Sequence, residues 1–388
     1  MPEASIKLCF SICLTLTVSI PILAQKKVII DWSVCAELPS ETPNTKHRGL
    51  AGAYSGIIKN TLIIFGGANF PDKMPWDGGV KKYHSTLYVL SLSGKKPCQW
   101  VNSKINFPVS LAYGATVLYK NKLICIGGEN ENGPTDKIWQ VSLHPLGDTV
   151  LIKELSRLPM PLTNLTANIV GHTLFIAGGE SKTEVSNKLY SLDLKHIDKG
   201  FKNLSSVPVA LSHAVFLSNS AKSGADLFLI GGRKKNQHGI STLYSSVFKY
   251  NVKSNAWAAL ADLPYALSAL TGVTLSNNQI IILAGDAGET FSKTEEYLLA
   301  ISAEKEVAKK QELINQKNHL QINHPGFSKE ILQYDVQNNV WSGVGTFPYE
   351  AAVTTTALLW HKSILIPSGE IKAGIRTPKI FKGDVKQK

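Results

Sequence analysis

The stretch LIIFGG at Leu62–Gly67 is a short apolar run closed by a glycine pair, and the chain repeats it. Three close copies and two shorter ones follow: LICIGG at Leu123–Gly128, LFIAGG at Leu174–Gly179, LFLIGG at Leu227–Gly232, IILAG ending at Gly285 and LIPSG ending at Gly369. An apolar residue followed by proline precedes each copy, from Leu38-Pro39 to Phe347-Pro348. Six copies of one unit at a period of roughly 50 residues predict an array of the kelch type.

Each unit is expected to form one small β-sheet. The apolar run Leu62–Phe65 is too short for a stable helix and suits a strand buried on both faces. The glycines that follow allow a sharp turn and a close approach of neighbouring backbone. The spacings Tyr250…Trp257 and Tyr334…Trp341 place large aromatic rings where they can fill the space between sheets. Four strands per unit, arranged radially, predict an all-β, six-bladed kelch-type β-propeller.

The two ends of the array complement each other. Lys27–Leu38 reads as a fourth strand with no earlier strands to join, whereas the sixth glycine copy is followed by one further strand at Lys379–Val385. We therefore expect the N-terminal segment to become the outer strand of the sixth blade, because this closes the ring and removes free sheet edges. The propeller is predicted over residues 25–388.

Residues 1–24 precede the array and have a different character. Lys7 comes before the apolar run Leu8–Leu23, and Ala24 is a small residue at a cleavage position. This pattern is typical of a secretory signal peptide, and the run is short for a membrane span. The sequence therefore predicts an exported protein that is not inserted in the membrane after cleavage.

Three cysteines remain after that cleavage, and they show no disulfide framework or zinc-ligand spacing. Cys125 lies inside LICIGG and is expected to be a small core residue. A pair between Cys35 and Cys98 is conceivable, but the spacing favours unpaired thiols.

Two insertions interrupt the repeat. Asn69–Lys82 is a Gly- and Pro-containing excursion after the first glycine pair. Ser292–Gly326 is rich in Ala, Glu, Lys and Leu at helical spacing and falls between the second and third strands of blade five. The helical insertion is either a solvated decoration or a lid beside the central pocket, since long loops in compact domains often carry function.

The net charge is +12, but the lysines are dispersed rather than clustered with aromatic residues. Together with export, this argues against nucleic acid as a partner. The oligomeric state is not predicted.

Polar residues follow almost every glycine pair, at the ends of the strands that surround the propeller axis. These residues are Asn69, Glu129, Glu180, Arg233, Asp286 and Glu370. Each one alone could simply hold neighbouring blades together. Glu370 differs because Arg376 lies on the same loop, SGEIKAGIRT. A carboxylate can take a proton, and a guanidinium can bind a sugar carboxylate through two parallel hydrogen bonds.

Three segments carry a resemblance to a known family: GLAGAYSG…LIIFGGANFP, GGVKKYHSTLYV and GEIKAGIRT. The chain resembles the bacterial periplasmic N-acetylneuraminate mutarotases, also called epimerases, which are six-bladed kelch proteins that interconvert anomers of sialic acid. The resemblance covers essentially the whole mature chain. The order of its segments is rotated, as in a circularly permuted branch, and a closed ring tolerates permutation.

The resemblance implies roles for individual residues. Glu370 matches the proposed proton acceptor and Arg376 its partner arginine, while Asn69, Lys82 and His213 fall in matching stretches. Glu129, Glu180, Arg233 and Asp286 are added as candidate substrate-binding residues from their places around the axis. The implied substrate is a small acidic sugar in the periplasm, with no metal or redox cofactor.

Two other functions fit the same fold, because propellers carry many activities. The ring could bind a glycan without chemistry, or its rim could bind another protein as an adaptor. Export and the polar centre disfavour the adaptor, and GEIKAGIRT favours an enzyme over a glycan-binding module.

Overall fold

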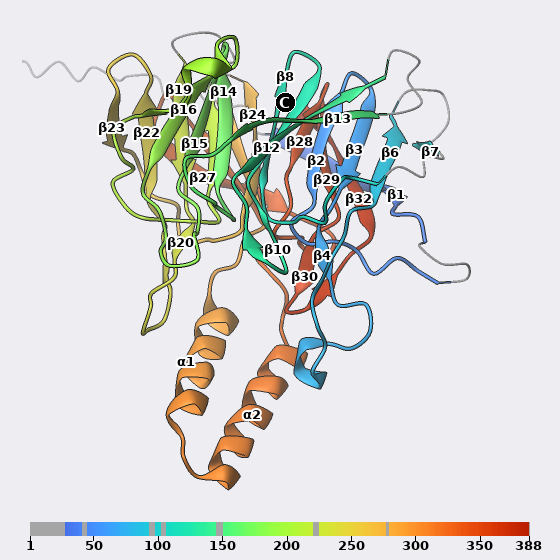
Figure 1. Cartoon of the computed structure of the whole chain (residues 1–388), viewed down its shortest axis with the longest axis vertical. Helices are drawn as coiled ribbons and strands as arrows, with labels where there is room; N and C mark the ends of the chain where they lie inside the picture. Colours follow the sequence, from blue (N-terminus) through green and yellow to red (C-terminus); the bar gives the residue numbers. More distant parts are fainter. Residues whose placement is uncertain are drawn as a thin grey trace, which may run out of the picture.

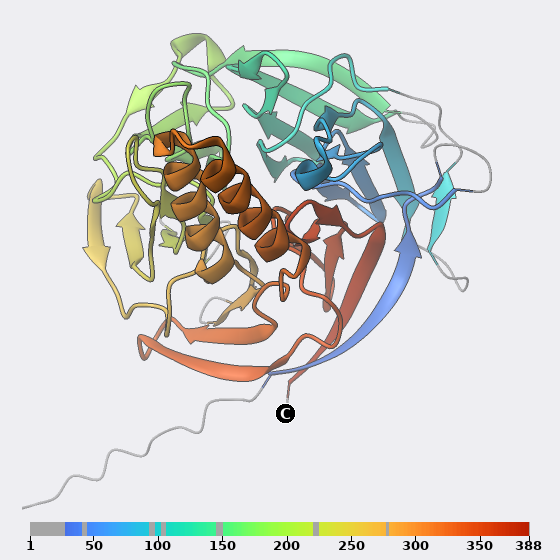
Figure 2. The same ribbon diagram turned by 90° about the horizontal axis from the view of Figure 1, so that it is seen from below.

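The computed structural model describes residues 28–40, 45–92, 98–101, 106–144, 150–219, 225–276 and 279–387. The predicted signal peptide lies outside these residues. The described residues form six four-stranded antiparallel sheets arranged radially around one axis, as Figure 2 shows. The predicted six-bladed propeller is confirmed.

The blades follow one another along the chain, with the innermost strand first in each. Blade one contains β2 (Tyr54–Ile58), β3 (Thr61–Phe65), β6 (Leu87–Ser91) and β7 (Gln99–Val101); blade two contains β8 (Ala115–Tyr119), β9 (Lys122–Ile126), β12 (Lys137–Leu143) and β13 (Val150–Arg157). Blade three contains β14 (Thr166–Val170), β15 (Thr173–Ala177), β16 (Leu189–Asp193) and β17 (Lys202–Asn203); blade four contains β18 (Val215–Ser218), β19 (Asp226–Ile230), β22 (Val247–Asn251) and β23 (Ala256–Ala259). Blade five contains β24 (Thr271–Ser276), β25 (Gln279–Leu283), β26 (Glu330–Asp335) and β27 (Val340–Thr346); blade six contains β28 (Leu358–Trp360), β29 (Ser363–Pro367), β32 (Lys379–Gln387) and β1 (Val28–Glu37).

Short elements extend from the loops between the second and third strands. Four of these loops form small hairpins: β4 (Ala68–Asn69) with β5 (Lys82–Tyr83), β10 (Glu129–Asn130) with β11 (Gly133–Pro134), β20 (Arg233–Lys234) with β21 (Thr242–Leu243), and β30 (Glu370–Lys372) with β31 (Ile375–Arg376). The described residues also contain two 3-10 turns: η1 (Pro75–Asp77) lies between β4 and β5, and η2 (Ile197–Lys199) lies between the third and fourth strands of blade three.

The repeated glycine motif forms the second strand of each blade and the turn after it. In blade one the apolar side chains of β3 are buried, and Gly66 has φ of 68°. A Cβ at Gly66 would lie 2.3 Å from the carbonyl oxygen of Leu111 in the next blade. The glycine is therefore required by close contact between blades as well as by its backbone conformation.

The predicted aromatic pairs pack between blades. The rings of Tyr250 and Trp257 have centroids 5.0 Å apart, and those of Tyr334 and Trp341 are 4.8 Å apart. Tyr334 also contacts Phe228 of the preceding blade at 6.4 Å. These contacts make the core a series of layers between adjacent sheets.

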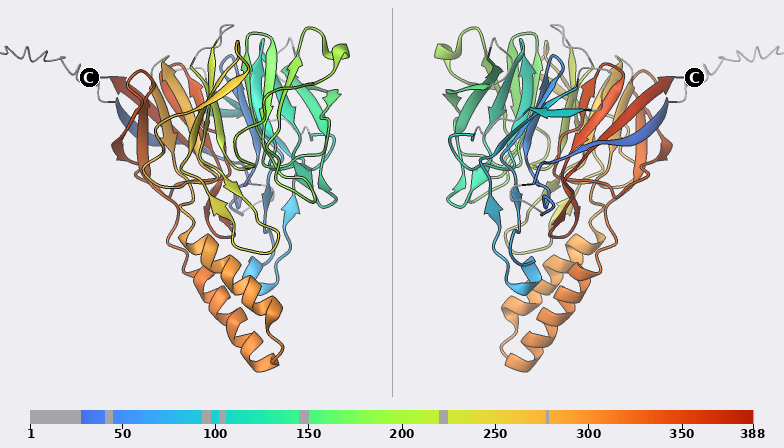
Figure 3. Two further views of the ribbon diagram at one scale, coloured as in Figure 1. Left: turned by 90° about the vertical axis from the view of Figure 1, so that its left-hand side faces the viewer. Right: turned by 90° about the vertical axis from the view of Figure 1, so that its right-hand side faces the viewer.

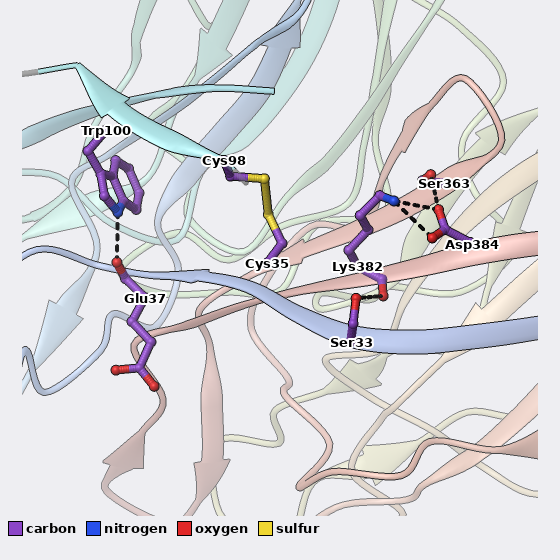
Figure 4. Close-up of a disulfide and its surroundings, with 8 residues drawn as sticks. All are labelled: Ser33, Cys35, Glu37, Cys98, Trp100, Ser363, Lys382 and Asp384. Atoms are coloured by element: carbon purple, nitrogen blue, oxygen red, sulfur yellow. Dashed lines mark hydrogen bonds and ion pairs between the residues drawn. A yellow bond between two sulfur atoms is a disulfide. The ribbon is translucent and has the colours of Figure 1, made fainter. Parts of the chain in front are cut away.

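The N-terminal strand closes the ring. Strand β1 pairs antiparallel with β32, giving the order β1-β32-β29-β28 in blade six, so the predicted closure is confirmed. A disulfide joins Cys35 of β1 to Cys98, which precedes β7 of blade one, with 6.2 Å between their Cα atoms (Figure 4). The prediction of unpaired thiols is wrong, because closure brings together cysteines separated by 63 residues. Cys125 is buried in the core, as predicted.

A ring of backbone hydrogen bonds encircles the axis. In each blade, a residue shortly before the first strand has positive φ. Its N–H donates to the carbonyl of the equivalent residue in the preceding blade. The six residues are Gly52, Tyr113, Asn164, His213, Ala269 and Thr354. The N···O distances are between 2.7 and 3.3 Å. The N–H and the carbonyl of each of these six residues are therefore paired, as buried peptide groups require.

The predicted helical insertion lies between β25 and β26, the second and third strands of blade five. Helices α1 (Glu289–Ala303) and α2 (Val307–Ile322) pack as a hairpin that projects from one face of the propeller (Figures 1 and 3). The Asn318 side chain of α2 donates to the carbonyl of Trp76 in η1 at 3.2 Å, so the two insertions touch. Among the described residues no helix is long and apolar enough to span a membrane.

Candidate functional site

Two cavities lie along the axis, separated by the ring of backbone hydrogen bonds. The helix-side cavity, of about 390 Å³, is lined by the loops that follow the second strands and by the helical insertion. The strand-lined cavity, of about 420 Å³, is lined by the first strands of blades two to six and by Gly52 and Ala53, which precede the first strand of blade one. The helix-side cavity receives most of the predicted site residues, namely Glu129, His213, Arg233, Asp286, Glu370 and Arg376.

Glu370 and Arg376 face each other across the β30–β31 hairpin, in direct register. One carboxylate oxygen, Oε1 of Glu370, accepts the N–H of Gly374 at 2.8 Å and lies 3.6 Å from Nη2 of Arg376. The predicted convergence of these two side chains is therefore present in the structure. A tight hairpin achieves it, since cross-strand neighbours lie side by side.

Two guanidinium groups reach the helix-side cavity with unused donors. Among the described residues, Nε and Nη1 of Arg376 and Nε of Arg233 are buried without a hydrogen-bond partner. Arg376 lies over the ring of Phe70 at 4.9 Å, and Arg233 lies over Phe291 of α1 at 4.4 Å. Buried donors without partners are costly, so these arginines suit an anionic ligand that would accept their hydrogen bonds.

Arg233 is also the end of a chain of polar contacts. Its Nη2 lies 3.3 Å from Nε2 of His213, and a guanidinium can only donate, so Nε2 accepts. Nδ1 of His213 lies 2.8 Å from Oγ of Ser212, which donates to the Glu180 carboxylate. Burial and the charge of Arg233 lower the pKa of His213 and favour the neutral ring.

Glu180 holds this chain in place from outside the helix-side cavity. Burial alone would raise its pKa, but hydrogen bonds from His213 and Ser212 and the charge of Arg233 lower the pKa to about 2. The structure therefore places Glu180 behind His213 as a support, and not in the cavity wall where the sequence predicted it.

Glu129 lies in the wall opposite blade five and already has partners. Its Oε1 accepts the hydroxyl of Tyr83 at 2.7 Å and lies 3.9 Å from Nζ of Lys81. The ammonium of Lys81 also lies over the rings of Tyr83 and Tyr113, at 5.7 and 5.0 Å. In this corner of the cavity, the Lys81 ammonium therefore lies among two tyrosine rings and one carboxylate.

Asp286 and His324 form the wall contributed by blade five. Oδ1 of Asp286 accepts the N–H of Gly288 at 2.8 Å, and burial raises the pKa of this carboxyl. His324, just beyond α2, is 6% exposed, and its Nδ1 accepts the N–H of Gly326 at 2.9 Å. Burial lowers the pKa of His324, so the neutral ring carries its proton on Nε2.

Besides Glu180, two other predicted residues, Asn69 and Lys82, do not line the cavity. The Asn69 side chain is buried between the carbonyl of Gly49 and the ring of His84, so its role is structural. Lys82 pairs with Asn69 in the β4–β5 hairpin and is exposed, whereas the preceding Lys81 lines the cavity. Strand β5 begins at Lys82, so Lys81 lies in the loop just before the strand.

Several lining residues were missed by the sequence analysis. They are Phe70, Lys81, Tyr113, Asn164, Phe291 and His324. Phe291 and His324 belong to the helical insertion, so the insertion is part of the cavity wall and not a detached decoration. Within the described part of the chain, no group of three or more His, Cys, Asp or Glu side chains is arranged to hold a metal ion.

Comparison with known proteins adds the following. The family model described as N-acetylneuraminate epimerase matches residues 15–149 and 155–388. A Salmonella enteritidis PT4 protein named N-acetylneuraminate epimerase is 28% identical over 234 residues, covering 59% of this chain and 57% of the relative. A Pasteurella multocida protein of the same name is 25% identical over 218 residues, covering 56% and 55%. The aligned region thus spans little more than half the length of these relatives.

A solved structure described as "Structure of YjhT" superposes with a TM-score of 0.61 at 16% identity, covering 92% of this chain and all of that one. At this identity the likeness establishes the fold.

Proposed function

The chain belongs to the N-acetylneuraminate epimerase family, and we propose that it interconverts the α and β anomers of N-acetylneuraminate. The observation that carries this proposal is the helix-side cavity, where a carboxylate faces an arginine with unused buried donors. A sugar acid supplies both groups that such a site needs, a carboxylate for the guanidinium and an anomeric hydroxyl for the base.

The proposed reaction requires two proton transfers, one from the substrate and one to it. Mutarotation opens a cyclic hemiketal, so a base takes the anomeric hydroxyl proton while an acid protonates the ring oxygen as the C–O bond breaks. Glu370 is the candidate base, because the Gly374 N–H fixes one carboxylate oxygen and Arg376 lies beside it. Arg376 binds the substrate carboxylate or stabilises negative charge that develops on oxygen.

The remaining walls suit a sugar ring. Phe70 and Phe291 present aromatic faces, and Lys81, Tyr113 and Asn164 offer polar groups. A cavity of about 390 Å³ lies in the range of small-molecule sites. Closure of the helical insertion over a bound sugar is part of this proposal, since Phe291 and His324 form one wall.

We also propose that the protein works outside the cytoplasm. The apolar N-terminal segment has the pattern of a signal peptide. The Cys35–Cys98 disulfide supports this location, because disulfides persist in oxidising compartments such as the periplasm.

One-dimensional NMR tests the activity directly. Freshly dissolved or freshly released N-acetylneuraminate, far from its anomeric equilibrium, is followed with the protein, with heat-denatured protein and in buffer alone. We expect equilibration in excess of the buffer rate with folded protein only. Saturable binding with no excess rate would instead make the protein a non-catalytic glycan-binding propeller and would reject the enzymatic proposal.

A further inference from the structure

The residues that follow the glycine turns occupy equivalent positions around the axis in the six blades. The acidic residues at these positions differ in their contacts. In each blade, the residue that follows the glycine turn pairs through backbone hydrogen bonds with a second residue. This second residue comes directly before the blade's member of the axial hydrogen-bond ring, as Ser268, which pairs with Asp286, comes before Ala269. Four of these positions hold acids, Glu129, Glu180, Asp286 and Glu370. The fold therefore presents four carboxylates in one geometric setting, so differences among them come from their neighbours.

Three of the four carboxylates have charged or hydroxyl partners. Glu129 contacts Tyr83 and Lys81, and Glu370 lies beside Arg376. Glu180 accepts from Ser212 and contacts His213. These partners favour the ionised form of a carboxylate.

Asp286 is the exception. Within the described part of the chain it has no ion pair, and its one hydrogen-bond donor is the backbone N–H of Gly288. The repeat explains the difference: the blade after Glu180 places Ser212 at the bridging position, whereas the blade after Asp286 places Val353 there. A valine cannot donate a hydrogen bond, so the Asp286 carboxylate lacks the hydroxyl donor that Glu180 has.

Asp286 is nevertheless positioned like Glu370. Each carboxyl has one oxygen held by a glycine N–H, from Gly288 and Gly374 respectively, at 2.8 Å. The two residues belong to adjacent blades, and both line the helix-side cavity. The remaining oxygen of each carboxyl is available to a ligand in that cavity.

From this arrangement we propose that Asp286 is the second proton-transfer group of the site, donating a proton to the ring oxygen while Glu370 accepts the anomeric proton. The inference rests on the proposed mutarotation. It assigns Asp286 a catalytic contact with the reacting atoms, in place of the general substrate-binding role predicted from its position.

The proton count balances over the cycle. Ring opening moves the anomeric O–H proton to Glu370 and the Asp286 proton to the ring oxygen, and the C2–O bond breaks as the C2 carbonyl forms. After rotation about the adjacent C–C bond, Asp286 takes back a proton from the chain hydroxyl as the bond to C2 forms again. Glu370 returns its proton to the carbonyl oxygen, which regenerates the starting enzyme with the other anomer.

The surroundings of Asp286 favour this division of roles. Burial raises its pKa, and the negative charge of Glu370 acts in the same direction. Arg233 and His324 face it and act in the opposite direction, as does the Gly288 N–H. Burial lowers the pKa of His324, which favours its neutral ring and weakens its opposition to protonation of Asp286. A carboxyl whose pKa is raised by its surroundings is suited to act as a general acid.

Asp286→Asn keeps the shape and the acceptor for Gly288 but cannot donate an acidic proton. We expect the catalysed rate to fall by about 10²–10⁴-fold, while binding of N-acetylneuraminate, followed by calorimetry, is retained. The parent rate should fall at high pH, as Asp286 ionises, and the variant should lose this high-pH decline. Asp262→Asn, an exposed aspartate of the loop that connects blade four to blade five, is the matched control and should behave as the parent.

Asp286→Ala supplies an independent readout, because formic acid, the protonated form of added formate, can occupy the vacated space and donate the proton to the ring oxygen. Partial restoration of the rate by formate supports the proposal even if the Asn variant folds poorly. The proposal is overturned if Asp286→Asn retains more than about a tenth of the parent rate with an unchanged pH profile, or if formate restores nothing. An inactive parent protein would reject the proposed function itself, which is a separate result.

Discussion

The two axial cavities have similar volumes but very different walls. The strand-lined cavity is built from the first strands, and in the described part of the chain none of its lining residues is Asp, Glu, Lys or Arg. The helix-side cavity contains Lys81, Glu129, Arg233, Asp286, Glu370 and Arg376. The backbone ring separates the two, and the residues of the ring contribute to both walls.

This difference follows from what each wall must do. First strands must keep their pairing and their packing against neighbouring blades, which restricts their side chains. The loops after the second strands carry no such constraint, so they can hold charged groups and insertions. We infer that the chemistry is confined to the helix-side cavity, and the following predictions test that.

The largest effect is expected from Glu370→Gln. This change preserves the side-chain shape and removes the base, so the catalysed part of anomer exchange should fall by about 10²–10⁴-fold while binding survives. NMR equilibration rates, corrected for the buffer rate, measure it. Glu350→Gln, an exposed glutamate of the same blade, should retain the parent rate. A Glu370→Gln protein with near-parent activity would show that the base lies elsewhere.

A pH-dependent loss of stability is expected from Glu180→Gln. The pKa of Glu180 is about 2, below its usual 4.5, so the ionised side chain stabilises the fold above about pH 4.5, and this contribution disappears as the pH falls through about 2. It amounts to on the order of 3 kcal/mol. The difference in Tm between parent and variant should therefore be largest near neutral pH and shrink in acid. A difference in Tm that does not change with pH would contradict the proposed stabilisation by ionised Glu180.

Arg376→Ala should weaken binding of N-acetylneuraminate by about 10- to 100-fold, because charge-assisted hydrogen bonds contribute about 1.5–3 kcal/mol. Isothermal titration calorimetry gives the change in Kd. Arg157→Ala removes an arginine that is 57% exposed on the outer strand β13, and its Kd should match that of the parent. Equal affinities for all three proteins would remove Arg376 from the binding site.

The smallest effect is expected at the other end of the axis. Leu118 lines the strand-lined cavity and is 51% exposed. Leu118→Ser should leave both Kd and the catalysed rate within about twofold of the parent, since surface substitutions usually change free energies by less than about 0.5 kcal/mol. A large loss of activity in this variant would mean that the two cavities are coupled through the backbone ring.

Much of the architecture could be predicted from local sequence. The glycine motif, the aromatic spacing and the unmatched ends indicated six blades and the closure by β1, because strand period and turn residues are local properties. The pairing of Glu370 with Arg376 was equally accessible, since a short hairpin brings its own strands together.

Other features depended on distant parts of the chain. Cys35 and Cys98 meet only when the ring closes, so their spacing in sequence did not reveal the disulfide. Phe291 and His324 line the cavity because they lie at the base of the helical hairpin, near the start of α1 and just after α2, and helical periodicity alone does not specify how that base is placed.

The sequence by itself determined which loops carry polar groups, and the tertiary structure decided which of those groups face the cavity. Lys81 and Lys82 are adjacent in sequence, yet only Lys81, in the loop before β5, lines the wall. Glu180 and Asp286 hold equivalent positions, but Ser212 and Val353 from the following blades give them different partners. Contacts between blades join residues roughly 50 positions apart, so the protonation of each carboxyl is set by the assembled ring.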